Sequence, residues 1–239
     1  MYLDTSCKIF VIVDKITYFQ NLLKKHSKID LKKHYYLITV QFLGYRFHGW
    51  QKQPYLKTVH LMIDKTLKFI FGETPFKSLG SGRTDAMVSA QEAAFELFLE
   101  KPLVDLESFL QLFNHNLPQD IRALTIKEVT SDFNIIQSSK SKEYLYVFTC
   151  GEKCHPFCAP LMTSILDDLD IDLMKLGAKC FEGTHYFKTY CYKATDEGIY
   201  TRTIATCEIV ENTLFTANFF PNKSYILRVK GKGFMRNQI

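Results

Sequence analysis

Residues 80–90 of the chain read GSGRTDAMVSA, and this glycine-rich stretch governs how the rest of the sequence is interpreted. The glycines at 80 and 82 permit backbone angles that other residues avoid, so we expect a tight turn here. Arg83 and Asp85 flank a single residue, a spacing that suits a guanidinium–carboxylate pair and would keep the carboxylate ionised. Such a carboxylate can serve as a nucleophile or a general base, whereas most Arg-x-Asp triplets in glycine-rich loops are exposed surface turns.

The composition is that of a globular protein. The chain has 239 residues, 46% of them hydrophobic and 23% charged, which suffices for one large or two small domains. The net charge of +5 permits a polyanionic partner without requiring one. No apolar run has the length of a membrane span, and the N-terminus lacks a secretory signal. Seven cysteines without a framework pattern indicate reduced thiols, so we expect a cytoplasmic protein with no membrane partner.

Hydrophobic periods of two and of 3.6 residues divide the chain into strands and helices. Alternation predicts strands over residues 36–42, 93–99, 214–219 and 225–230, with a hairpin turn at Asn212-Thr213 and a further strand that begins at Arg202. Helical spacing predicts one helix capped by Thr58 and ended by Gly72, a second capped by Asp105, and a third that runs from Asp170 to Gly183. At position 87 the methionine side chain argues against a left-handed backbone.

The motif Gly-Arg-Thr-Asp-Ala-x-Val-x-Ala resembles the signature of the TruA-type tRNA pseudouridine synthases. Members usually have Gly where this chain has Met87. Other family landmarks follow in the family's order: an aromatic-Gly-Trp-Gln stretch over 45–53, Asn-Leu-Pro-x-Asp at 116–120, Lys-x-Tyr-x-Tyr at 142–146, Gly-Thr-His-Tyr-Phe at 183–187 and Gly-x-Gly-Phe at 231–234. The stretch Phe133-Asn134-Ile135-Ile136 departs from the family's Phe-His-Ala-Arg.

This resemblance implies roles for individual residues. Asp85 corresponds to the essential catalytic aspartate, and Arg83 is expected to orient it and keep it ionised. Tyr144 matches the tyrosine that stacks on the target uracil, whereas Tyr146 and Phe148 are assigned to the core. The remaining cations and His48 are candidates for RNA contact, with a solvated surface charge as the alternative for each: Arg46, His48, Lys142, Arg228, Lys230, Lys232 and Arg236.

The implied fold is α+β, the pseudouridine synthase fold, with two similar halves of mostly antiparallel sheet, each backed by helices, and a basic RNA-binding cleft between them. We expect an N-terminal half over 35–140 that carries the Asp85 loop and a C-terminal half over 141–239. The C-terminal half stops just before the family's arginine that bonds the catalytic carboxylate. Residues 1–34 lie outside the resemblance and form an N-terminal extension, with a short strand over 8–13 and helical spacing from Ile16 to Leu23.

The implied reaction isomerises uridine to pseudouridine at positions 38, 39 and 40 in the anticodon arm of tRNA. A base paired in a stem must first be flipped out of the helix. Nothing is oxidised or consumed, so neither a cofactor nor a metal is expected, and the resemblance implies a homodimer.

Two alternatives remain. The first is a non-catalytic RNA-binding protein that keeps the fold, prompted by Met87, the altered stretch at 133–136 and the missing arginine. The second is a metal-binding module built on Cys150, Cys154 and Cys158 with His155, although its ligand set is incomplete.

Overall fold

The computed structural model describes residues 9–13, 33–138, 141–235 and 238–239. Its strands in chain order are β1 (Ile9–Val13), β2 (His34–Phe42), β3 (Phe76–Gly80), β4 (Ser89–Leu99), β5 (Ile121–Val129), β6 (Lys142–Cys150), β7 (Thr163–Ile165), β8 (Gly183–Tyr186), β9 (Thr201–Glu211) and β10 (Tyr225–Gly231). The helices are α1 (Val59–Phe71), α2 (Leu106–Asn116), the single turn α3 (Ile135–Ser138) and α4 (Ile171–Lys179). Short 3₁₀ turns occur at Gly44–Arg46, Pro156–Cys158 and Lys188–Tyr190.

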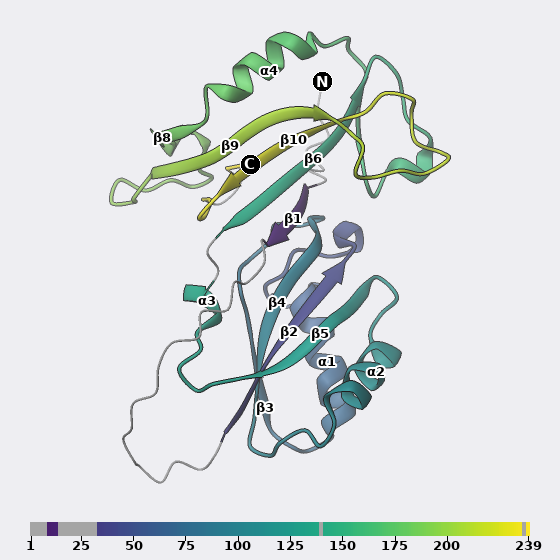
Figure 1. Cartoon of the computed structure of the whole chain (residues 1–239), viewed down its shortest axis with the longest axis vertical. Helices are drawn as coiled ribbons and strands as arrows, with labels where there is room; N and C mark the ends of the chain where they lie inside the picture. The colour runs from purple at the N-terminus through teal and green to yellow at the C-terminus, as the bar shows by residue number, and fades with distance from the viewer. Residues whose placement is uncertain (1–8, 14–32, 139–140, 236–237) are drawn as a thin grey trace.

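The strands form a mostly antiparallel sheet in the order β5-β2-β4-β1-β6-β10-β9-β8, with β3 added to β4 and β7 to β6. Only the β1–β4 and β6–β7 pairs are parallel among the described strands. Figure 1 shows β2–β5 with α1 and α2 in one part of the molecule, and β6, β9 and β10 with α4 in the other. The predicted α+β architecture of helix-backed, mostly antiparallel sheet is therefore confirmed.

The N-terminal half is built as its hydrophobic pattern predicts. Tyr36, Ile38, Val40 and Phe42 alternate along β2 and are buried in one cluster with residues of α1 and α2. Each helix begins at its expected cap, because the Thr58 hydroxyl accepts from the backbone N–H of Leu61 at 3.3 Å and the Asp105 carboxylate accepts from the first turn of α2. Gly72 ends α1 with a φ of 58°.

In the C-terminal half, α4 packs against the part of the sheet formed by β6, β9 and β10. Phe148 of β6 packs with Ile209 and Val229 of the neighbouring strands and with Ala178 of the helix. Tyr146, also on β6, is partly buried and contacts this cluster as well as the N-terminal one. The core assignments of Tyr146 and Phe148 are thereby confirmed, and Tyr146 belongs to both halves.

Strand β1 joins the two halves. It runs parallel to β4, with Phe10 opposite Ser89, and antiparallel to β6, with Val13 opposite Lys142. Figure 1 shows it between β4 and β6 at the boundary of the two parts. The predicted strand near residues 8–13 is confirmed at 9–13, and this part of the expected extension is an internal strand of the sheet. The helical spacing from Ile16 to Leu23 and part of the expected boundary between the halves, at residues 139–140, lie outside the described residues.

One predicted strand is wrong, and the third helix begins at its predicted cap Asp170 but ends early. Residues 214–219 form no strand, because the Asn212 side chain accepts from the backbone N–H of Phe215 and donates to its carbonyl oxygen, which closes a loop instead of a hairpin. β9 pairs instead with β10. The third helix ends at Lys179 rather than at Gly183, whose φ of 98° places it at the start of β8.

Across the described ranges, no helix combines the length and the apolar character needed to span a lipid bilayer.

Candidate active site

Asp85 lies in the loop that joins β3 to β4. β3 runs antiparallel to β4 and ends at Gly80, opposite Phe95. The backbone nitrogen of Ser81 still donates to the carbonyl oxygen of Ala94 at 2.9 Å, and the chain then leaves the sheet. Asp85 is exposed beyond the end of these two paired strands, where a large substrate can reach it.

A second loop, residues 44–50, holds the Asp85 loop by backbone contacts. The Trp50 N–H donates to the Thr84 carbonyl oxygen at 3.2 Å, and the Met87 N–H donates to the Phe47 carbonyl oxygen at 2.9 Å. Gly49 has a φ of 85°, and a Cβ on it would lie 2.5 Å from the Thr84 oxygen, so only glycine permits this approach. The aromatic-Gly-Trp-Gln motif therefore supports the Asp85 loop from one side.

Gly80 and Gly82 provide room and not unusual backbone angles, which corrects the expectation of a glycine-dependent turn. Neither has a positive φ. A Cβ on Gly80 would lie 2.2 Å from Nε1 of the buried Trp50 indole, and a Cβ on Gly82 would lie 2.8 Å from Nζ of Lys142. The two glycines let an aromatic ring and a lysine approach the loop closely.

Met87 adopts the left-handed conformation that its side chain was expected to exclude. Its φ is 65°. The hydrogen bond from its N–H fixes the residue on one side, and on the other the buried Ser89 hydroxyl accepts from the Gly44 N–H at 2.8 Å. These contacts impose a backbone conformation that costs a non-glycine residue about 1–2 kcal/mol.

Tyr144 and Asp85 lie close enough to interact electrostatically, although they come from different halves. Tyr144 is on β6, and its ring packs edge-on against Phe234 with the centroids 5.0 Å apart. Burial, and next the negative charge of Asp85, raise the pKa of Tyr144 to about 12. The phenol therefore stays neutral at physiological pH and presents a flat apolar ring and a hydroxyl beside the carboxylate.

Arg83, Lys142 and Lys232 line one pocket of about 380 Å³ beside the Asp85 loop. Arg83 comes from the loop itself, Lys142 opens β6 and Lys232 follows β10. Within the described part of the chain no ion pair links Arg83 to Asp85, so the local pair expected from their spacing is not formed. The pocket nonetheless gathers three cations beside the loop that carries the candidate catalytic carboxylate.

Arg46 and His48 lie on the supporting loop and have partners within the protein. The Arg46 guanidinium forms an ion pair with Asp120, with Nη2 2.7 Å from Oδ2. The exposed His48 ring lies with Nδ1 3.4 Å from the Lys57 carbonyl oxygen. The structure thus gives Arg46 a role in tying the supporting loop to the start of β5, and RNA contact by either residue stays a prediction.

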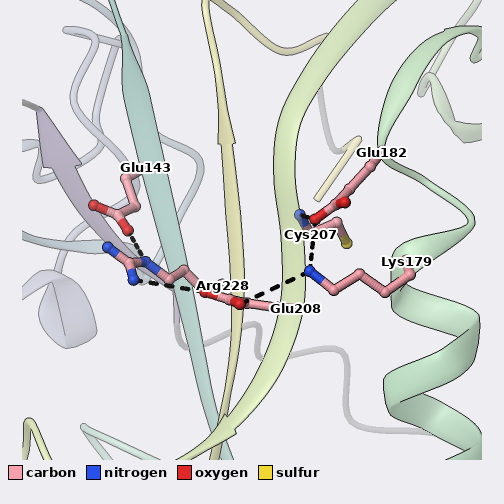
Figure 2. A network of polar contacts seen from close by, with 6 residues as sticks. All are labelled: Glu143, Lys179, Glu182, Cys207, Glu208 and Arg228. Carbon is pink, nitrogen blue, oxygen red and sulfur yellow. Dashed lines mark hydrogen bonds and ion pairs between the residues drawn. The ribbon is translucent and has the colours of Figure 1, made fainter.

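Arg228 belongs to a polar network on the C-terminal half and not to the pocket (Figure 2). Its guanidinium pairs with the buried carboxylate of Glu143 on β6, and Nη1 lies 3.6 Å from Oε1 of Glu208 on β9. Lys179 of α4 extends the network to Glu208 and Glu182. Two carboxylates thus engage the charge of Arg228 within the protein, and phosphate contact by Arg228 stays a prediction.

The sequence patterns did not predict a polar cluster that lies next to Trp50. The His60 ring stacks on the Trp50 indole at 5.8 Å, and its Nε2 lies 2.7 Å from the Ser78 hydroxyl. Ser78 in turn donates to Asp64, which pairs with Lys52. The only available signal was the spacing of His60 and Asp64 by four residues on α1, since the contact with Ser78 depends on the position of β3.

Arg236 lies outside the described residues. The cysteines considered for metal binding have contacts of their own: the Cys158 thiol donates to the Phe219 carbonyl oxygen, and the Cys154 sulfur lies 3.7 Å from that of Met162. Among described side chains, no group of three or more His, Cys, Asp or Glu residues is arranged to hold an ion.

Comparison with known proteins identifies relatives over most of the chain. A tRNA pseudouridine synthase A from Exiguobacterium sibiricum is 33% identical over 201 residues, which cover 84% of this chain and 76% of that protein. The protein of the same name from Aquifex aeolicus is 35% identical over 153 residues, 64% of this chain and 63% of its own. That from Listeria monocytogenes is 28% identical over 204 residues, 85% and 79% of the two chains. No protein-family model matches the chain.

The similarity to the Exiguobacterium protein covers more than three quarters of that protein, and the exposed aspartate, the tyrosine beside it and the supporting loop over 44–50 lie together in the fold. The chain belongs to the tRNA pseudouridine synthase A family.

Proposed function

We propose that this chain isomerises uridine to pseudouridine at positions 38, 39 and 40 in the anticodon arm of tRNA, with Asp85 as the catalytic residue. Family membership makes it a tRNA-modifying isomerase. The position of the Asp85 carboxylate beside the partly buried Tyr144 ring is the observation that carries the assignment of the site. In the reaction the bond between uracil N1 and the ribose C1′ breaks, and a bond between C5 and C1′ forms. The C5 proton is released and N1 gains one, so atoms and electrons balance without a co-reactant.

The proposed roles follow from the surroundings of each side chain. The Tyr144 ring stacks on the uracil while Asp85 attacks the nucleotide or removes a sugar proton. Arg83 is exposed two residues from Asp85, and in this proposal it orients that carboxylate, as the resemblance implies. The active protein is a cytoplasmic homodimer in this proposal, as in the family, with the pseudouridine synthase fold and an RNA-binding cleft between its halves.

Tritium release from tRNA labelled at uracil C5 tests the reaction directly. We expect release by the unchanged chain, none by Asp85→Asn, and full release by the control Asp172→Asn, whose carboxylate is exposed on α4 and pairs with Lys175 on the same helix. Binding of tRNA without release by the unchanged chain would favour the alternative, an RNA-binding protein without catalysis. Sedimentation at several concentrations tests the dimer separately.

A further inference from the structure

The pocket beside the Asp85 loop joins positive charges from three separate segments. Arg83, Lys142 and Lys232 line it, and none of its lining residues in the described chain is acidic. Like charges that converge on one concave site repel one another, so the arrangement costs free energy in the absence of an anion. The charge pattern therefore points to a negatively charged ligand.

Lys142 is the most informative of the three cations. It is half-buried, and its amine lies so close to the loop backbone that a Cβ on Gly82 would come within 2.8 Å of Nζ. Among the described residues the amine has no hydrogen-bond or ion-pair partner, and burial lowers its pKa. A desolvated ammonium group without a partner is unfavourable unless a ligand supplies the missing acceptor. An anion in the pocket would do so.

The remaining walls show what kind of anion fits. The pocket volume of about 380 Å³ lies in the range of small-ligand sites. Trp50, Leu79 and the 60% exposed Ile136 add apolar surface next to the cations. A phosphate joined to sugars matches this combination, because its oxygens meet the cations while the ribose lies against apolar side chains.

We propose that this pocket binds one phosphodiester group of the RNA backbone next to the nucleotide on which Asp85 acts, with Lys142 as its principal contact. The inference rests on the proposed function and adds to it a specific subsite. Lys142 and Tyr144 share strand β6, whereas Arg83 and Asp85 share the loop. A phosphate held by Lys142 and Arg83 together links the strand that carries the tyrosine to the loop that carries the aspartate, so binding of the correct backbone also orients the two site residues.

The test uses anticodon-arm RNAs in which a single phosphate is replaced by an uncharged methylphosphonate, moved one position at a time across the target uridine. Affinity is measured for the unchanged chain, Lys142→Met and Lys153→Met. Lys153 is a matched control because it lies beyond Cys150, at the end of β6 opposite Lys142.

In the unchanged chain and in the control we expect one replacement to weaken binding by about tenfold or more, the size of one charge-assisted hydrogen bond. In Lys142→Met the same replacement should change affinity less than about twofold, because the contact is already lost.

Equal losses in the unchanged chain and in Lys142→Met overturn the proposal, as does the absence of any sensitive position. Lys142→Arg keeps the charge and should retain the sensitivity, which separates loss of the contact from misfolding of Lys142→Met. Competition by inorganic phosphate tests whether the pocket binds a free anion instead. If phosphate competes with RNA, Lys142→Met abolishes this competition and no backbone position is sensitive, the pocket binds a free anion and the proposal is overturned. Tritium release is scored independently, so its failure would count against the proposed reaction and not against this subsite.

Discussion

The backbone nitrogen of Met87 donates a hydrogen bond to the carbonyl oxygen of Phe47, and Met87 holds a left-handed φ of 65° in doing so. This conformation is accessible to glycine at little cost and to a β-branched residue only with strain. We expect Met87→Gly to change the free energy of unfolding by less than about 1 kcal/mol, because relief of the backbone strain offsets the flexibility gained by the unfolded chain. Met87→Val should be destabilised by about 2 kcal/mol or more.

Urea unfolding of both variants measures the difference, and Met174 provides the comparison. Met174 lies within α4 and has no positive φ, so glycine there should be worse than valine. The order of the two substitutions is thus reversed between positions 87 and 174. The same order at both positions would show that backbone strain at Met87 is not what limits the loop.

Gly44 lies against the backbone of the strand that follows the Asp85 loop. A Cβ on Gly44 would come 1.9 Å from the Val88 carbonyl oxygen, and the Gly44 N–H donates to the Ser89 hydroxyl at 2.8 Å, which holds the two segments together. We expect Gly44→Ala to lower the free energy of unfolding by about 2–3 kcal/mol. Gly177 serves as the control, because nothing lies within 4 Å of its Cβ position in α4 and alanine should stabilise that helix by about 0.5–1 kcal/mol. A Gly44→Ala protein as stable as the unchanged chain would contradict the close packing of the two loops.

Local rules were sufficient for β2, α1 and α2, because their hydrophobic periods and their capping residues Thr58 and Asp105 act within a few residues. Local rules failed where a residue far away in the sequence determines the backbone conformation or the partner of a side chain. The backbone of Met87 is set by Phe47, and the Arg228 charge is engaged by Glu143 because β10 pairs with β6 in one particular register. The motifs that resemble the family assigned both Asp85 and Tyr144 to the site. The distance between the two residues, in contrast, depends on how the halves are joined.

His60 provides a test by pH. Burial, as the largest influence, lowers the pKa of His60 below its ordinary value of 6.5, against the opposing effect of Asp64, and Lys52 lowers it further. A base whose pKa is lower in the folded than in the unfolded state stabilises the fold above the unfolded pKa. This stabilisation is lost as the pH falls from about 6.5 through the folded pKa.

We therefore expect the free energy of unfolding to fall more between pH 7.5 and 5.5 in the unchanged chain than in His60→Gln, which keeps a polar group near Ser78 but cannot take up a proton. Urea titrations at both pH values give the comparison, and tryptophan fluorescence reports on the stacked Trp50, the single tryptophan of the chain. Equal pH dependence in the two proteins would mean that His60 does not titrate in this range.

Arg228 should matter for folding and not for RNA binding. Its removal leaves the Glu143 carboxylate, whose side chain is 5% exposed, without the guanidinium. We expect Arg228→Met to lower the free energy of unfolding by about 1–3 kcal/mol, the cost of a buried polar group that loses its partner. The double variant Glu143→Gln with Arg228→Met should recover part of this loss, because a neutral amide needs less compensation than a carboxylate.

The dependence of tRNA affinity on salt separates the two roles of Arg228. A phosphate contact contributes about one unit to the slope of log affinity against log salt concentration, so the slope should be unchanged in Arg228→Met. Under the pocket proposal, Lys142→Met lowers the same slope. A reduced slope in Arg228→Met would restore the arginine to the RNA-binding surface.

The backbone of Val11 links the strand after the Asp85 loop to the strand of Tyr144, since Val11 lies opposite Ala90 on β4 and opposite Tyr144 on β6. β1 thereby sets how far apart the two site strands lie, because neighbouring strands are about 4.8 Å apart.

Proline at this position removes an N–H and does not fit within a central strand, whereas threonine keeps the N–H and the β-branched shape. We expect Val11→Pro to lower kcat for pseudouridine formation by about tenfold or more, since a misplacement of about 1 Å can cost a hundredfold. Val11→Thr should leave kcat within about twofold, because it preserves the strand ladder. The measurement separates kcat from KM, with kcat taken at saturating tRNA. The far-ultraviolet circular dichroism of each variant shows whether the remaining strands and helices are intact. If Val11→Pro folds and turns over like the unchanged chain, β1 does not position the site, and the two halves must hold Asp85 beside Tyr144 through other contacts such as those of Tyr146 and Ile239 with both cores.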